Sequence, residues 1–148
     1  MTGKSDFTEQ EWDTVRKGPP AAGLLVASAA RGGTFKESYA IAKSYGEARK
    51  QHGASELLDA IVSAKPEIEH HLYHSYDELK NAGLEHVRDA VQVLESKATP
   101  DEVSDYRRFV LTLADKVANA HQEDGMAVSG PERAVIADIT EALGGSGA

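Results

Sequence analysis

Four short motifs in this sequence place a serine or threonine three residues before a glutamate, the spacing of a helix capping box. In a capping box the hydroxyl accepts a hydrogen bond from the third helical amide, and the glutamate accepts one from the amide of the capping residue. The four pairs are Thr8–Glu11, Thr34–Glu37, Thr99–Glu102 and Ser129–Glu132. Phe7 and Trp12 flank the first pair at the positions of a hydrophobic staple. Together they predict four helix starts.

Apolar residues between these starts recur at spacings of three and four residues, which is typical of amphipathic helices. The longest predicted helix runs from Thr99 to about Gln122, and the last from about Gly130 to Leu143. Gly144 then suits the position after the last helical turn, where glycine is favoured. No segment alternates apolar and polar residues as a strand would. The sequence therefore predicts an all-α fold.

Proline and glycine positions set the predicted number of helices. Pro19 suits the first turn of a helix that begins there, and Gly83 suits a helix end. Counting these boundaries, we expect one compact domain over residues 1–148, a bundle of about seven or eight helices. The predicted core consists of Leu24, Val26, Leu58, Ile61, Leu72, Leu79, Val91, Leu94, Val110, Leu113, Val117, Ile136 and Ile139.

The composition excludes several classes of protein. Sixteen basic and 24 acidic side chains give a net charge of −8, which argues against nucleic-acid binding. The absence of cysteine excludes disulfides and cysteine nucleophiles. The longest apolar stretch, residues 19–30, is shorter than the roughly 20 residues of a membrane span. We therefore expect a cytoplasmic protein, with residues 1–6 and 144–148 mobile.

Two segments of the chain share a pattern, residues 26–42 and residues 117–137. Each has a Val-Ala-x-Ala run, a loop, a capping box and an Ile-Ala pair, and the isoleucine follows the cap by seven residues in both. This predicts two related helix–loop–helix units that pack against each other. The alternative is chance, since alanine-rich helices and capping boxes are both common.

The loop of the second unit is the first candidate site. Asp115, Glu123, Asp124 and Glu132 lie in or near this loop, and their carboxylates could converge on a divalent cation. Carboxylate and carbonyl oxygens are the ligands that Ca²⁺ and Mg²⁺ prefer. The spacing is not that of an EF-hand. Alternatively, Asp124 begins an ordinary Asp-Gly turn, Glu132 serves only the capping box, and no cofactor is bound.

A group of histidines is the second candidate. On a helix, Glu67, His70 and His74 would share one face, and histidines four residues apart can chelate Zn²⁺. That face is turned away from the apolar stripe, so the alternative is a solvated polar surface. A histidine-based metalloenzyme is therefore the third functional hypothesis.

The second unit resembles the tellurite-resistance TerB-like domain family. The similarity lies in Val117-Ala118-x-Ala120, Glu123-Asp124-Gly125, Val128-Ser129-x-x-Glu132, Ile136 and Leu143-Gly144. These correspond to a helix of small residues, an acidic Asp-Gly loop, a hydroxyl–x–x–Glu cap and a closing leucine–glycine pair. The resemblance is specific over residues 113–144 and weaker over residues 7–48.

The resemblance implies an all-α fold of two related halves, acidic loop residues that bind metal, and a role in stress response. Asp124 and Glu132 match the acidic motif, whereas Asp115 and Glu123 are its neighbours. The first half departs from the pattern, because its loop reads Arg31-Gly32-Gly33 and has no Asp-Gly pair.

Three functions are therefore open at this point. The preferred hypothesis is a non-enzymatic, acidic TerB-like domain that holds a divalent cation such as Ca²⁺ or Mg²⁺. The alternative is a protein-interaction or scaffold domain without metal, and the third is the histidine-based enzyme. The sequence does not predict the oligomeric state or name a protein partner.

Overall fold

The structure is a computed structural model that describes residues 6–29, 34–50, 56–63, 76–123 and 130–144. These residues form six helices and no strand, so the predicted all-α bundle is confirmed, whereas the predicted number of seven or eight helices is not. Most of the terminal residues expected to be mobile lie outside the described part. The helices are α1 (Glu9–Ala29), α2 (Thr34–Lys50), α3 (Glu56–Val62), α4 (Tyr76–Lys97), α5 (Pro100–Glu123) and α6 (Gly130–Ala142).

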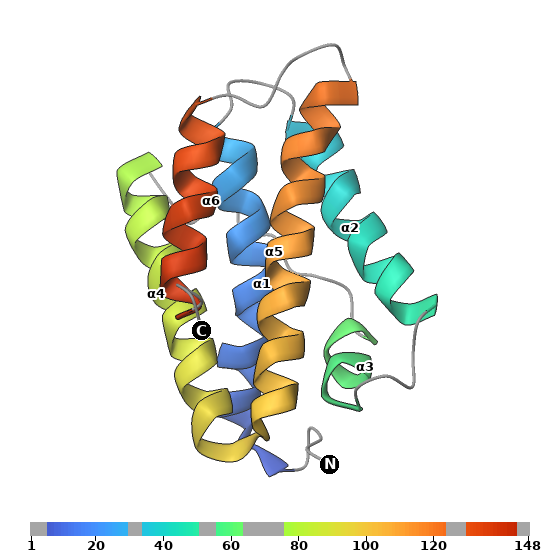
Figure 1. Ribbon diagram of the computed structural model, residues 1–148, viewed down its shortest axis with the longest axis vertical. Coiled ribbons are helices and arrows are strands. Elements are labelled where there is room, and N and C mark those ends of the chain that lie inside the picture. Colours follow the sequence, from blue (N-terminus) through green and yellow to red (C-terminus); the bar gives the residue numbers. More distant parts are fainter. Residues whose placement is uncertain (1–5, 30–33, 51–55, 64–75, 124–129, 145–148) are drawn as a thin grey trace.

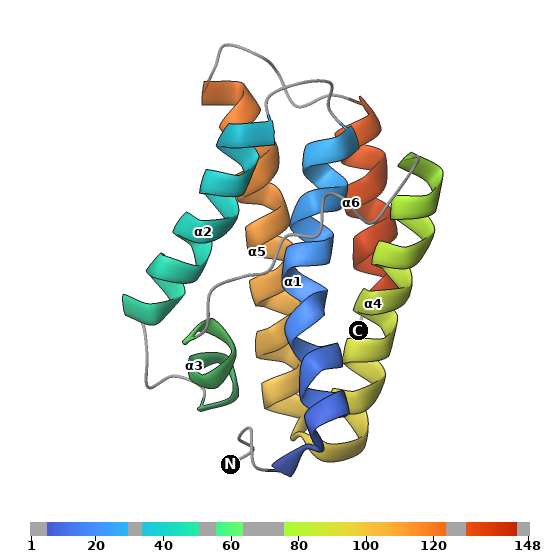
Figure 2. The same cartoon turned by 180° about the vertical axis from the view of Figure 1, so that it is seen from behind.

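Helix α1 is the centre of the bundle. It packs against α4 and α5 and also contacts α2 and α6. Figures 1 and 2 show it between the α4–α6 pair on one side and the α5–α2 pair on the other. The short helix α3 packs beside α2 and α5 near the opposite end from the α1–α2 turn.

Helix α1 is continuous through Pro19 and Pro20, so the prediction that Pro19 opens a separate helix is wrong. A proline in a helix interior has no N–H for the carbonyl four residues earlier, which here is that of Val15. The hydroxyl of Tyr106 on α5 donates a 2.8 Å hydrogen bond to this carbonyl oxygen. The buried backbone oxygen is thereby satisfied from a neighbouring helix, and α1 does not break.

Helix α4 is likewise continuous through Gly83, so the predicted helix end at this residue is wrong. Gly83 is buried, and a Cβ atom placed on it would lie 3.0 Å from Leu25 on α1. The absence of a side chain therefore lets α4 approach α1 closely. This glycine serves helix packing rather than helix termination.

Two capping boxes are confirmed. The amide of Thr8 donates to the Glu11 carboxylate at 2.9 Å, and the amide of Glu11 donates to the Thr8 hydroxyl at 3.1 Å. The Thr99–Glu102 box has the same pair of hydrogen bonds, at 2.9 and 3.2 Å. The predicted staple is also present, with the rings of Phe7 and Trp12 5.6 Å apart. The side chains of the other two boxes lie outside the described set.

The C-terminal end of α6 is followed by Gly144, as predicted. Gly144 has a φ of +73°, a conformation that favours glycine after the last helical turn. Arg107 on α5 donates a 2.6 Å hydrogen bond to the carbonyl oxygen of Leu143. This contact ties the end of α6 to α5.

The predicted core is largely confirmed. Ten of the thirteen predicted residues are buried, Leu58 and Ile136 are half-buried, and Leu72 lies outside the described part. Tyr45 and Tyr106 are fully buried and add two large aromatic side chains to this core. No helix among the described residues is long and apolar enough to cross a membrane.

Candidate functional site

The predicted acidic site is only partly described by the structure. Asp115 is exposed on α5, Glu123 is the last residue of α5, and Glu132 is the third residue of α6. Asp124 lies outside the described residues, as do the side chains of Glu123 and Glu132. Along α5, Asp115 and Glu123 are separated by about 12 Å of helix axis. Convergence of the four carboxylates on one cation therefore remains a prediction.

The chain reversal between α5 and α6 places two of these residues at one end of the bundle. The two helices pack against each other, and six residues, 124–129, join them. The end of α5 and the first turn of α6 lie at the same end of the bundle, where Figure 1 shows them separated across its width. Within the described part of the chain, no three histidine, aspartate or glutamate side chains gather as a metal site would require.

Asp115 shows one sign of an altered environment. Although the residue is exposed overall, partial burial of its carboxyl raises the pKa of this group above its usual value. Burial is the cause of this rise in the pKa of Asp115, and no positively charged group in the described part of the chain counteracts it.

Glu67, His70 and His74 of the second candidate site lie outside the described residues, so that site also stays a prediction.

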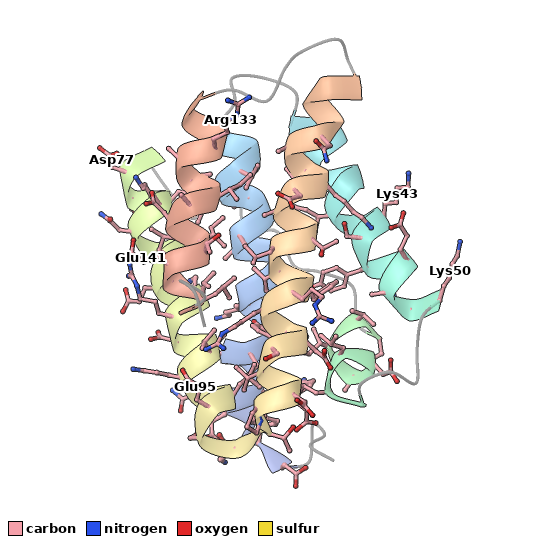
Figure 3. The ribbon with its side chains drawn as sticks, in the orientation of Figure 1. Lys43, Lys50, Asp77, Glu95, Arg133 and Glu141 are labelled. Atoms are coloured by element: carbon pink, nitrogen blue, oxygen red, sulfur yellow. The ribbon has the colours of Figure 1, made fainter. Side chains whose placement is uncertain are left out.

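The described residues form a different concave site, a cleft between α2, α3 and α5. Its volume is about 270 Å³. The apolar lining comes from Ala48 on α2, Leu58 on α3, and Phe109 and Leu113 on α5. Figure 3 shows side chains in the region between these three helices. We refer to it below as the α2–α3–α5 cleft.

Charged side chains form the rim of the α2–α3–α5 cleft. Lys116 on α5 makes a salt bridge with Glu47 on α2. This hydrogen bond with Lys116 is the main reason that the pKa of Glu47 is lowered. Arg108 lies 3.8 Å from Asp105 on the next turn of the same helix. Each of these two basic side chains thus faces an acidic neighbour.

Ser44 is the unusual residue of the cleft wall. It is only 3% exposed, and its hydroxyl makes no hydrogen bond to any group in the described structure. Buried polar side chains nearly always have a hydrogen-bond partner, and an unsatisfied one is costly. A buried hydroxyl without a partner beside a cleft is therefore a feature that calls for an explanation.

Side-chain contacts between α2, α3 and α5 fix the positions of the three helices that line the cleft. The ring of Phe109 packs edge-on against that of Tyr45, with centroids 5.4 Å apart, which joins α5 to α2. Burial raises the pKa of Tyr45, so its hydroxyl stays protonated. Arg49 at the end of α2 donates to the carbonyl oxygen of Val62 and fixes the last turn of α3. The three walls are thereby held together.

This cleft could not be predicted from the sequence, because its residues come from three helices that are distant along the chain. One signal was present. Ile41, Ser44, Tyr45 and Ala48 have the helical spacing i, i+3, i+4 and i+7 of a buried stripe. Ser44 is a polar residue within that apolar stripe, and a polar residue at a buried position indicates that its side chain has a specific role.

Comparison of the chain with known protein families, with curated proteins and with solved structures finds no match.

Proposed function

We propose that this chain is a non-enzymatic, acidic helical domain similar to the TerB-like family, which holds a divalent cation between α5 and α6 and acts in stress response. The observation that carries the proposal is the reversal of the chain at this point. Glu123 ends α5, Glu132 lies in the first turn of the adjacent α6, and Asp124 is one of only six residues between the helices. Such a short connection restricts the distance between these residues.

The chemistry of this end of the bundle favours a cation such as Ca²⁺ or Mg²⁺. Asp124 and Glu132 supply the two carboxylates of the motif, and Glu123 and Asp115 add negative charge from α5. The last carbonyl groups of α5 carry the negative end of the helix dipole. The last turn of α5, His121-Gln122-Glu123, contains no lysine or arginine that would neutralise it.

The packing of the helices supports the proposed internal repeat. The end of α1, the start of α2, the end of α5 and the start of α6 all lie at the same end of the bundle (Figures 1 and 2). Helix α2 packs against α5, and α6 packs against α1. A twofold axis between α1 and α5 would exchange the two hairpins and produce this crossed arrangement. We therefore propose that residues 26–42 and 117–137 are related units.

The test is thermal unfolding of chelator-treated protein with and without Ca²⁺, Mg²⁺ or Zn²⁺. A ligand at a hundred times its dissociation constant stabilises the native state by about 2.7 kcal/mol. We expect such a shift with Ca²⁺ or Mg²⁺, and its loss in the double variant Asp124→Asn/Glu132→Gln. The matched control is Asp89→Asn/Glu95→Gln, which removes the same charge from the exposed face of α4. An unchanged shift in the first variant would overturn the proposal.

Zinc separates the metal-based alternatives. A shift with Zn²⁺ alone, lost on His70→Ala/His74→Ala, would assign metal binding to the histidine segment instead. No shift with any of the ions would favour the alternative function, a protein-interaction or scaffold domain without metal. The half-buried Leu58 and Phe109 of the α2–α3–α5 cleft are the described feature that supports that alternative.

A further inference from the structure

We propose that the α2–α3–α5 cleft is a binding site for a small, neutral, flat apolar molecule that carries one hydrogen-bonding group, which the hydroxyl of Ser44 recognises. This proposal goes beyond the cation site and does not depend on it. The two sites lie on different sets of helices, since the acidic site is proposed between α5 and α6 and the cleft is lined by α2, α3 and α5.

The first observation is an apolar floor that the protein itself covers only in part. Leu113 is fully buried, whereas Ala48, Leu58 and Phe109 are half-buried and pack against the core from its edge. Because Tyr45 packs edge-on against Phe109, the two rings form a corner rather than a stack. A flat ring placed in the cleft would bury the remaining apolar surface and could pack against Phe109 in an offset or edge-to-face geometry.

The second observation is the unsatisfied hydroxyl of Ser44. Ile41, Tyr45 and Ala48 lie beside it on its own helix, and it is excluded from water without receiving or donating a hydrogen bond in the described structure. A ligand with one polar atom at its edge would satisfy this hydroxyl after a rotation of the serine side chain. Sites that hold a buried polar group discriminate strongly against analogues that leave it unpaired.

The third observation is the charge at the rim, which selects the ligand's charge. Lys116 is engaged by Glu47, and Arg108 faces Asp105, so neither basic group is without an acidic neighbour. A charged ligand would have to compete with these neighbours in water. A neutral ligand has no such competition, and its affinity would come from the apolar floor and from Ser44.

The size of the cleft limits the ligand to a small one. Its volume of about 270 Å³ lies just below the usual range of about 300–1,000 Å³ for small-molecule sites. One or two fused rings are of suitable size. Indole is therefore an appropriate probe, and indene is its matched isostere, because it has almost the same shape but no N–H donor.

The experiment is a titration of the ¹⁵N-labelled full chain with indole and with indene, followed by amide chemical shifts. We expect shifts at residues that line the cleft and a lower dissociation constant for indole than for indene by about three- to tenfold, the contribution of one hydrogen bond. Ser44→Ala should remove this difference. Equal affinities in the unmodified protein, or shifts centred elsewhere, would overturn the proposal.

Two further variants keep the test independent of folding. Ala48→Phe places a ring in the cleft and should abolish binding of both probes. Ala137→Phe adds the same ring to an exposed position on α6 and should leave binding unchanged. Ser44→Ala should also be no less stable than the unmodified protein, because it removes an unsatisfied polar group. Loss of binding in Ala137→Phe, or its retention in Ala48→Phe, would contradict the assignment.

Charged and peptide probes test the ligand class. Benzoate and benzylamine should bind more weakly than indole, and tighter binding of either would overturn the inference of a neutral ligand. The peptide acetyl-Gly-Trp-Gly-amide presents the same indole ring on a chain. If it binds tenfold or more tightly than indole, the cleft accepts the side chain of a protein partner, and the small-molecule assignment is wrong.

Discussion

The hydroxyl of Tyr106 donates a hydrogen bond to the carbonyl oxygen of Val15, the oxygen that Pro19 leaves without its helical donor. The two residues are 91 positions apart in the sequence. Burial raises the pKa of Tyr106 well above its usual value, so this hydroxyl remains a donor at all ordinary pH values. One side chain of α5 therefore allows the central helix to contain Pro19 in its interior.

Replacing Tyr106 by phenylalanine should destabilise the protein by about 1–3 kcal/mol, because it leaves the buried Val15 carbonyl unsatisfied. Chemical denaturation measures the loss. In a Pro19→Ala background the helix regains a backbone donor for this carbonyl, so the same substitution should cost less. An equal cost in both backgrounds would show that the hydrogen bond does not compensate for the proline.

Gly18→Ala should destabilise the protein by about 1–3 kcal/mol, the usual cost of overpacking a core. A Cβ atom at this position would lie 2.1 Å from the Tyr106 hydroxyl oxygen, which is closer than any permitted contact. The control is Gly46→Ala on α2, where a Cβ would meet nothing within 4 Å. There the substitution should stabilise the helix by about 0.5–1 kcal/mol. Equal effects of the two substitutions on the unfolding midpoint would contradict the close approach of α1 and α5.

Thr99→Ala should cost about 1 kcal/mol of stability, because the amide of Glu102 loses the hydroxyl that caps the start of α5. Thr99→Ser retains a hydroxyl and should restore most of the loss. The comparison is made by urea denaturation of the three proteins. A serine variant as unstable as the alanine variant would indicate that the threonine methyl group, and not the cap, is important.

Asp115→Asn should raise stability at neutral pH. The pKa of this carboxyl is raised in the folded state, so the folded protein binds the proton more tightly than the unfolded chain does. Ionisation of Asp115 therefore destabilises the folded state. This destabilisation is fully present at pH values above the folded-state pKa, and it is absent at pH values below the ordinary pKa of an aspartate. The gain from asparagine should be present at pH 7 and disappear towards pH 3. Thermal unfolding at both pH values tests this, and a gain independent of pH would have another cause.

Features that depend on neighbouring residues could be predicted from the sequence. The Thr8–Glu11 and Thr99–Glu102 boxes are such features, because the hydroxyl and the glutamate meet within one helical turn. The bounds predicted for α5 and α6 agree with those observed to within one or two residues for the same reason.

The helix number could not be predicted, because it depends on contacts between distant residues. Pro19 ordinarily marks a boundary, and only a tyrosine on another helix makes it tolerable inside α1. Gly83 ordinarily marks an end, and only the approach of Leu25 shows that it serves packing. Neither partner can be identified from the residues around the proline or the glycine.

The α2–α3–α5 cleft was missed for a related reason. Helical spacing shows that Ser44 and Phe109 lie on or near apolar faces, but not that these faces meet incompletely. The acidic loop could be identified from the sequence because its residues are close together along the chain. The convergence of its carboxylates on one cation stays a prediction.

The central position of α1 has a consequence for how the chain is made. Synthesis proceeds from the N-terminus, so α1 leaves the ribosome before α4 and α5, the helices against which it chiefly packs. Its apolar segment, which includes Leu24, Leu25 and Val26, stays largely uncovered until α4 has also been translated. The nascent chain therefore passes through a stage in which the apolar segment of its central helix is accessible to cellular chaperones, and the bundle can close only after the later helices have been made.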